Sequence, residues 1–230
     1  MLFRKAILIV HGFAGGTYDE EYLQHRLELI RNHDVYTFTL AGHEGLFNPN
    51  MTESEWIKSA EDMMDFLIEN NYKTIYVIGH SMGGVIATHL ANKYKEIKKI
   101  VLVAAAFRFI GYSEDNFKIT ETIKNTPKIM KDYTKDEIVT RFLKMSLPAV
   151  KEFTNLVKDN EDSLKTIDIP VLIIQGNNDV LVPLETADYI YNTIPSKNKN
   201  VLICQGVTHD IFRSERKDEI TREIIEFLKK

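Results

Sequence analysis

Short apolar runs alternate with longer amphipathic segments along this chain. Runs rich in β-branched residues cover 6–10, 35–38 and 74–78, and segments with apolar residues at helical spacing lie near 20–30 and 53–70. A short apolar run fits a buried strand, whereas apolar positions three and four residues apart mark one face of a helix. The alternation predicts successive βαβ units and a parallel sheet.

The alternation of strands and helices stops after the fourth predicted strand and resumes about sixty residues later. Between about 104 and 166 no strand-like run of comparable quality occurs, and Thr134 to Glu137 has the residue types of a helix capping box. Before the break come a helix at 82–94 and the fourth strand at 99–103. After it come strands at 170–175 and 200–204 and helices at 184–193 and 215–228.

These elements predict an α/β fold with a compact, six-stranded, all-parallel sheet flanked by helices. The break after the fourth strand predicts a helical cap over 104–166, inserted into a single domain that covers 1–230. Neither an internal repeat nor a low-complexity linker supports a domain boundary within the chain.

A serine lies at the junction between the strand at 74–78 and the helix that follows it. The segment Gly79-His80-Ser81-Met82-Gly83 has the pattern G-x-S-x-G. Glycines at its two ends allow a turn so tight that the serine hydroxyl stands exposed. Ser81 is therefore a candidate nucleophile.

Serine is a poor nucleophile near neutral pH and needs an imidazole to take its proton and a carboxylate to orient that imidazole. Asp179 follows the strand at 170–175, and His209 follows the strand at 200–204. Right-handed crossovers bring such loops to one edge of a parallel sheet, where open α/β folds bind ligands. We expect Asp179 to act as the acid and His209 as the base.

Three other carboxylates compete for the role of acid. Asp168 precedes its strand, so it is expected at the opposite edge of the sheet, and Asp188 falls inside a predicted helix. Asp210 adjoins His209 but is not placed to bond the far nitrogen of its ring. Asp179 is the candidate that remains.

Hydrolysis through a tetrahedral intermediate also requires two donors for the oxyanion. The backbone N–H of Met82 lies at the start of a helix, where the dipole favours negative charge. The glycine-rich loop at 11–16 can bring a second N–H close to the substrate, and we assign it to Phe13.

At this point the chain resembles the α/β-hydrolase superfamily, in particular small bacterial carboxylesterases and monoacylglycerol-lipase-like enzymes with a helical cap. The resemblance rests on five motifs in order: HGFAGG at 11–16, AGHEG at 41–45, GHSMGG at 79–84, QGNNDVLVP at 175–183 and GVTHD at 206–210. It implies a Ser81–His209–Asp179 triad, with Phe13 and Met82 as oxyanion donors. It also implies that the strand ending at Val10 lies beside the strand ending at Ile78. The chain departs from larger relatives, because its first strand-like run already leads into His11-Gly12-Phe13 and leaves no room for their two leading antiparallel strands.

Composition narrows the partners. A net charge of −4 argues against nucleic-acid binding. The single cysteine, Cys204, lies in an apolar run and is expected in the core. No apolar run approaches the length of a secretory signal or a membrane span, so we expect a cytoplasmic protein. The expected partner is a small-molecule ester, and the oligomeric state stays open.

Neither a cofactor nor a metal is expected. The spacing of His11 and His80 fits no zinc pattern, and both are expected to support the oxyanion loop and the turn at Ser81 through hydrogen bonds. His43 is expected to order a loop near the site.

The predicted reaction is cleavage of carboxylic esters with short to medium apolar acyl chains. A thioesterase, a feruloyl-type esterase, a peptidase, a carbon–carbon hydrolase and a non-catalytic small-molecule receptor share the same residues and stay open. Some of the large apolar residues of the cap should line the acyl pocket. They are Phe107, Phe109, Ile110, Tyr112, Phe117, Ile129, Met130, Tyr133, Phe142, Met145 and Phe153.

Overall fold

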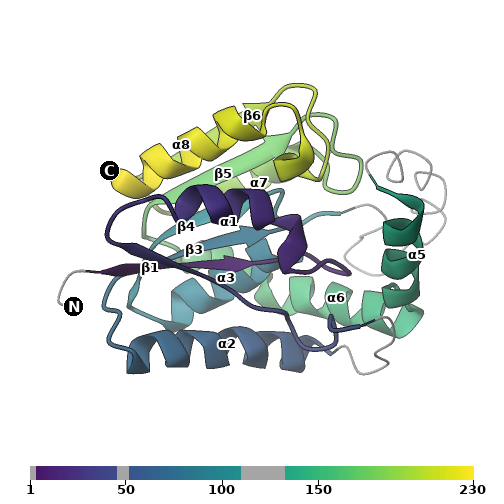
Figure 1. Cartoon of the computed structure of the whole chain (residues 1–230), viewed down its shortest axis with the longest axis horizontal. Coiled ribbons are helices and arrows are strands. Elements are labelled where there is room, and N and C mark those ends of the chain that lie inside the picture. The colour runs from purple at the N-terminus through teal and green to yellow at the C-terminus, as the bar shows by residue number, and fades with distance from the viewer. Residues whose placement is uncertain (1–3, 46–51, 110–132) are drawn as a thin grey trace.

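A computed structural model describes residues 4–45, 52–109 and 133–230 (Figure 1). Its centre is a six-stranded sheet with the order β2-β1-β3-β4-β5-β6, and every neighbouring pair is parallel. The strands are β1 (Lys5–Val10), β2 (His33–Thr37), β3 (Ile75–His80), β4 (Ile97–Val103), β5 (Val171–Gly176) and β6 (Lys199–Cys204). The predicted sheet is confirmed.

Helices cover both faces of the sheet. On one face α1 and α8 pack against it, and on the other lie α2, α3, α6 and α7 (Figure 1). The helices are α1 (Glu21–Leu27), α2 (Glu53–Glu69), α3 (Met82–Lys93), α5 (Lys135–Lys144), α6 (Leu147–Asn160), α7 (Glu185–Thr193) and α8 (Lys217–Lys229). Short 3₁₀ segments are η1 (Thr17–Asp19), η3 (Glu161–Thr166) and η4 (Ile211–Arg213).

The apolar pattern explains how each element packs. In β1 the side chains of Leu8 and Val10 join the core on one face of the sheet, and those of Ile7 and Ile9 join the core on the other. Such alternation is the geometry of a strand buried on both faces. In α2 the buried residues recur every three or four positions, which forms one apolar stripe toward the sheet.

The third strand continues past its apolar run. The run predicted a strand over 74–78, but β3 extends to His80, because Gly79 and His80 still pair with Leu102 and Val103 of β4. Backbone pairing, rather than hydrophobicity, sets this boundary. The strand therefore carries the chain directly to Ser81.

The regular elements described between β4 and β5 are all helical: α5 and α6 follow in sequence, and η3 ends the region. The predicted capping box is confirmed: the N–H of Glu137 donates to Thr134 Oγ1 at 3.3 Å, and the N–H of Thr134 donates to Glu137 Oε2 at 2.8 Å. Ser146 caps α6 by accepting from the N–H of Ala149. Cap boundaries at 104 and 166 stay a prediction. Across the three described segments, no helix has the length and apolarity that crossing a membrane requires.

Candidate active site

Ser81 occupies a strained turn between β3 and α3. Its φ of 55° and ψ of −118° are unusual for a residue with a side chain. Backbone hydrogen bonds hold this conformation: the N–H of Ser81 donates to Val103 O at 2.9 Å, and the Ser81 carbonyl accepts from the N–H of Ala106 at 3.1 Å. Strain of this kind persists where surrounding contacts determine the geometry, and it concentrates at functional sites.

The glycines around Ser81 are required by close packing. A Cβ on Gly79 would overlap the backbone of Gly83, and a Cβ on Gly83 would overlap the carbonyl of Val10. The G-x-S-x-G pattern thus reflects two backbone approaches that a side chain would block.

Asp179 and His209 lie together after β5 and β6. His209 Nδ1 is 2.8 Å from Asp179 Oδ2. Asp179 Oδ1 accepts from the N–H groups of Leu181 and Val182 at 2.8 and 2.9 Å. Gln175 Nε2 donates to Asp179 Oδ2 at 3.0 Å. The sequence analysis assigns no role to Gln175, the polar residue of β5.

The environment keeps Asp179 ionised. Burial is the largest influence and would raise its pKa, but the charge and hydrogen bond of His209 and the two backbone donors outweigh it, so the pKa of Asp179 is lowered. An ionised Asp179 favours the His209 tautomer with the proton on Nδ1, which leaves Nε2 able to accept a proton.

Ser81 is connected to the His209–Asp179 pair through its neighbour His80 rather than through its own hydroxyl. Among the described residues, no hydrogen bond connects the Ser81 hydroxyl to the His209 ring. The contact runs through the residue before the serine: His80 Nε2 is 3.1 Å from the carbonyl oxygen of His209, and the two imidazole rings are 5.1 Å apart.

The loop after β1 lies against the turn at Ser81, as the predicted strand order requires. Val10 pairs with Gly79, and a Cβ on Gly12 would lie 3.1 Å from the Cβ of Ser81. Met82 is the first residue of α3, where backbone N–H groups lack helical acceptors. The roles of Phe13 and Met82 as oxyanion donors stay a prediction.

Comparison with known families agrees with this geometry. The model of the alpha/beta hydrolase fold family matches residues 5–135. The chain belongs to this family. A second family model, serine aminopeptidase S33, matches residues 114–217.

Curated relatives of this α/β-hydrolase match over almost its whole length. A carboxylesterase of Bacillus subtilis (strain 168) is 25% identical, over 98% of this chain and 93% of the relative. A thermostable monoacylglycerol lipase of Bacillus sp. (strain H-257) is 26% identical, over 88% of this chain and 82% of the relative. A solved structure from a study of two metagenome-derived lipolytic enzymes has a TM-score of 0.77 at 23% identity, and covers 98% of this chain and 94% of its own.

Two histidines support the loop at 11–16, the predicted oxyanion loop of this α/β-hydrolase, as predicted. His11 Nε2 accepts from the N–H of Leu40 at 3.0 Å, and His43 Nε2 accepts from the N–H of Ala14 at 3.2 Å. Each ring nitrogen can accept only while it is unprotonated. The loop therefore depends on both imidazoles being neutral.

His80 supports the turn, as predicted, and its carboxylate partner is an addition from the structure. Its Nδ1 is 2.8 Å from Glu20 Oε1. Glu20 is 1% exposed and lies just before α1. An acidic residue at a helix start is common, because it complements the helix dipole, so the sequence alone gives no sign of this pairing.

The remaining sequence candidates lie away from the chemistry. Asp188 lies in α7 and Asp168 precedes β5, as predicted. Cys204 is 1% exposed, and burial raises the pKa of its thiol to about 11, which disfavours a nucleophilic thiolate.

Aromatic side chains gather beside the oxyanion loop. Phe153 of α6 stacks on Phe13 with ring centroids 5.2 Å apart, and on Phe109 at 4.6 Å. The ring of Trp56 meets that of Phe13 edge-on at 5.8 Å. Ile110, Tyr112, Phe117, Ile129 and Met130 lie outside the described residues, and so does the side chain of Phe142.

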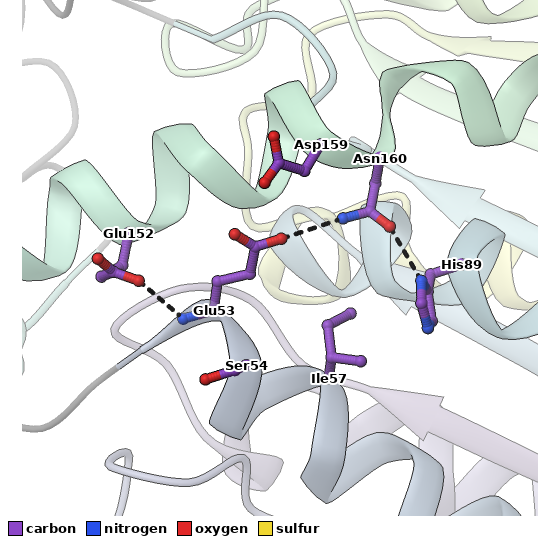
Figure 2. Close-up of a pocket in the computed structure, with 7 residues that line it drawn as sticks. All are labelled: Glu53, Ser54, Ile57, His89, Glu152, Asp159 and Asn160. Carbon is purple, nitrogen blue, oxygen red and sulfur yellow. Dashed lines mark hydrogen bonds between the residues drawn. The ribbon is translucent and has the colours of Figure 1, made fainter.

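A separate, acidic pocket lies between α2, α3 and α6 (Figure 2). Its volume is about 460 Å³, and Glu53, Glu152 and Asp159 bring three carboxylates to its walls. Burial, with the charges of Asp159 and Glu152, raises the pKa of Glu53. His89, which also lines the pocket, lies eight residues after Ser81, or roughly 12 Å along the helix axis, so the pocket is distinct from the turn. The described residues contain no cluster of three or more side chains suited to a metal ion.

Proposed function

We propose that this α/β-hydrolase cleaves carboxylic esters with short to medium apolar acyl chains through a Ser81–His209–Asp179 triad. At the level of class it is a serine ester hydrolase of the esterase and lipase type, since its near-full-length relatives, a carboxylesterase and a monoacylglycerol lipase, are of that type. The triad and the substrate range are the parts that we infer from the site.

One observation carries the proposal. The imidazole of His209 and the carboxylate of Asp179 form a 2.8 Å hydrogen bond in loops at the same edge of the sheet as the Ser81 turn. An ionised carboxylate on Nδ1 orients an imidazole as a general base for a neighbouring serine.

In the proposed mechanism, His209 Nε2 takes the proton from Ser81 as its hydroxyl oxygen attacks the ester carbonyl. The N–H groups of Phe13 and Met82 stabilise the oxyanion of the tetrahedral intermediate. His209 then protonates the departing alcohol, which leaves an acyl-enzyme on Ser81. A water molecule, deprotonated by His209, releases the acid and restores the serine.

The aromatic residues beside the oxyanion loop support an apolar acyl group. The backbone of Phe13 is the proposed oxyanion donor, and its side chain stacks on Phe153 of the cap. A substrate whose carbonyl meets the Phe13 N–H would therefore lie close to apolar ring surface, which favours an alkyl chain over a charged one.

A series of p-nitrophenyl esters with two to sixteen acyl carbons tests the proposal, together with labelling by a fluorophosphonate. We expect turnover to be highest for short to medium chains, and Ser81→Ala to abolish both turnover and labelling. Ser54→Ala, an exposed serine on α2, is the matched control and should behave like wild type. Absence of hydrolysis and labelling in wild type would overturn the proposal.

A peptidase is the second candidate, because the model of serine aminopeptidase S33 matches residues 114–217. Amino-acid p-nitroanilides separate the two, because the anilide nitrogen is a poorer leaving group than p-nitrophenolate and must be protonated as it departs. We expect no anilide turnover above background, whereas anilide cleavage that is lost in Ser81→Ala would indicate a peptidase. Thioester and feruloyl substrates in the same series test for a thioesterase and a feruloyl-type esterase, and binding without turnover would indicate a receptor.

A further inference from the structure

His80 makes two hydrogen bonds in opposite directions within the buried part of the site. Its Nδ1 is 2.8 Å from Glu20 Oε1, and its Nε2 is 3.1 Å from the carbonyl oxygen of His209. His80 and Glu20 are 5% and 1% exposed. Both distances are those of well-formed hydrogen bonds.

The donors and acceptors determine how many protons the pair holds. A backbone carbonyl cannot donate, so His80 Nε2 must carry a proton. A second proton must lie between Nδ1 and Glu20 Oε1, either on the ring or on the carboxyl. If this proton is lost, a lone pair on one ring nitrogen faces an oxygen, and one of the two bonds breaks.

Three carboxylates near His80 favour the extra proton. Glu20 precedes α1, Asp19 ends η1, and Asp210 follows His209 in the loop before η4, while the uncharged ring of Phe212 meets the His80 ring edge-on. The Asp19 carboxylate is itself paired with Arg141 and Arg213.

These groups act together on the two pKa values. Burial would lower the pKa of His80 and is the largest influence, but the hydrogen bond and charge of Glu20, with the charges of Asp210 and Asp19, raise it to about 9. Burial raises the pKa of Glu20 against the opposing hydrogen bond from His80. Glu20 Oε2 is buried without a hydrogen-bond partner, which further disfavours a bare carboxylate.

We propose that Glu20 and His80 are positioning residues, and that the proton they share holds the backbone of the base His209 in place. The proposal rests on the proposed Ser81–His209–Asp179 triad. Asp179 fixes the ring of His209 from one side, and His80 fixes its main chain from the other, where the carbonyl also accepts from the N–H of Ile211. Since His80 precedes Ser81, the same side chain ties the nucleophile to the base.

Loss of the shared proton should therefore reduce turnover at alkaline pH. Above about pH 9 the His80–Glu20 pair loses a proton, and either the bond to Glu20 or the bond to His209 is lost. Turnover is expected to fall through kcat, because a displaced base affects proton transfer more than binding of the ester.

Two substitutions of Glu20 separate positioning from plain structural support. Glu20→Ala leaves His80 Nδ1 without a partner and should lower kcat at pH 7.5 by roughly tenfold. Glu20→Gln should restore most of this loss, because its amide N–H donates to Nδ1 while the neutral ring still donates from Nε2 to His209. Since this arrangement has no proton to lose, the decline of kcat near pH 9 should disappear in Glu20→Gln.

The chain offers a matched control in a second histidine–glutamate pair. His89 of α3 is 3.0 Å from Glu61 of α2, away from Ser81. Glu61→Gln should leave the profile of kcat against pH unchanged. Activity that recovers fully when protein is returned from pH 10 to pH 7.5 excludes unfolding as the cause of the decline.

A measurement on the wild-type chain covers the event that a variant does not fold. Imidazole ¹⁵N resonances, followed by NMR from pH 6 to pH 10, should include one that titrates near pH 9 and is absent from that range in Glu20→Gln. If no imidazole resonance moves between pH 8 and pH 10 in the wild-type chain, the pair does not lose a proton in this range and the proposed alkaline loss of positioning is overturned.

The outcomes distinguish this proposal from the one on which it rests. Normal ester hydrolysis with parallel pH profiles for wild type and Glu20→Gln overturns the positioning role and leaves the triad untouched. Absence of ester hydrolysis by wild type overturns both, whatever the NMR titration shows. Hydrolysis with an alkaline decline that Glu20→Gln removes supports both.

Discussion

Two histidine–carboxylate pairs lie side by side in this molecule, and each is joined by a hydrogen bond of the same length. His209 is 2.8 Å from Asp179, and His80 is 2.8 Å from Glu20. Both carboxylates are buried, yet the pKa of Asp179 is lowered and that of Glu20 is raised, in each case with burial as the largest single influence. The two carboxylates therefore differ in proton affinity: that of Asp179 is lower than usual, and that of Glu20 is higher.

The hydrogen-bond donors around each carboxylate explain the difference. Asp179 accepts from two backbone N–H groups and the amide of Gln175 in addition to His209. Glu20 has an oxygen that is buried and unpaired. A carboxylate with several donors stays ionised when buried, whereas one with few holds a proton. The first pair suits a base that exchanges protons, and the second suits a fixed support.

The largest expected effect comes from removing the charge of the first pair. Asp179→Asn should lower kcat by about 10⁴-fold, because an amide can donate to Nδ1 and so stabilises the wrong tautomer of His209. Turnover of a p-nitrophenyl ester measures it, with circular dichroism to confirm folding. A loss of less than about tenfold would assign the acid to another residue and remove the contrast with Glu20.

The two pairs should also respond to pH in opposite directions. The pKa of His80 in the folded chain, about 9, exceeds the usual value of 6.5, so its contribution to the free energy of unfolding is complete below pH 6.5 and is lost as pH rises through 9. That of Asp179 is complete above pH 3.8 and is lost as pH falls through its lowered pKa.

Urea unfolding of wild type and two variants measures both contributions. Between pH 6.5 and 10, wild type should lose on the order of 2 kcal/mol relative to Glu20→Gln. Below pH 4, wild type should lose stability relative to Asp179→Asn. Parallel curves on the alkaline side would mean that the two pairs do not differ in their affinity for a proton.

A smaller effect is expected from removing one of the hydrogen-bond donors to Asp179. Gln175→Leu removes one hydrogen bond to this buried charge, and should lower the free energy of unfolding by about 1.5 kcal/mol and raise the pKa of Asp179. Gln205→Leu, an exposed glutamine after β6, is the control and should stay within about 0.5 kcal/mol of wild type. If the two variants have equal stability, donor number does not explain the difference between the pairs.

The sequence predicts the first pair and not the second, for a physical reason. Asp179 and His209 each lie in the loop that follows an apolar run, so a parallel sheet alone brings them to one edge. Glu20 meets His80 through the position of the segment between the oxyanion loop and α1, sixty residues away, and no periodicity records that contact. Gln175 stands out as the polar residue of β5, but no pattern records that its side chain meets Asp179.

The cap shows which features local residue types predict and which depend on long-range packing. A helical character and the Thr134–Glu137 capping box follow from local residue types, and the described residues of 133–166 confirm both. The stacking of Phe153 on Phe13 depends on how α6 is placed against the sheet. Long-range packing of this kind is not encoded at any fixed spacing, so the acyl pocket could not be predicted.

The sheet order has a consequence for how activity is divided along the chain. Ser81 lies in the part that contains β1 to β4, whereas Asp179 and His209 follow β5 and β6, and the parallel pairing of β4 with β5 joins the two parts. A backbone cut within the cap would place the proposed nucleophile, Ser81, on one fragment and its proposed base, His209, on the other. Ester hydrolysis by mixed fragments would then report their reassociation, with neither fragment active alone.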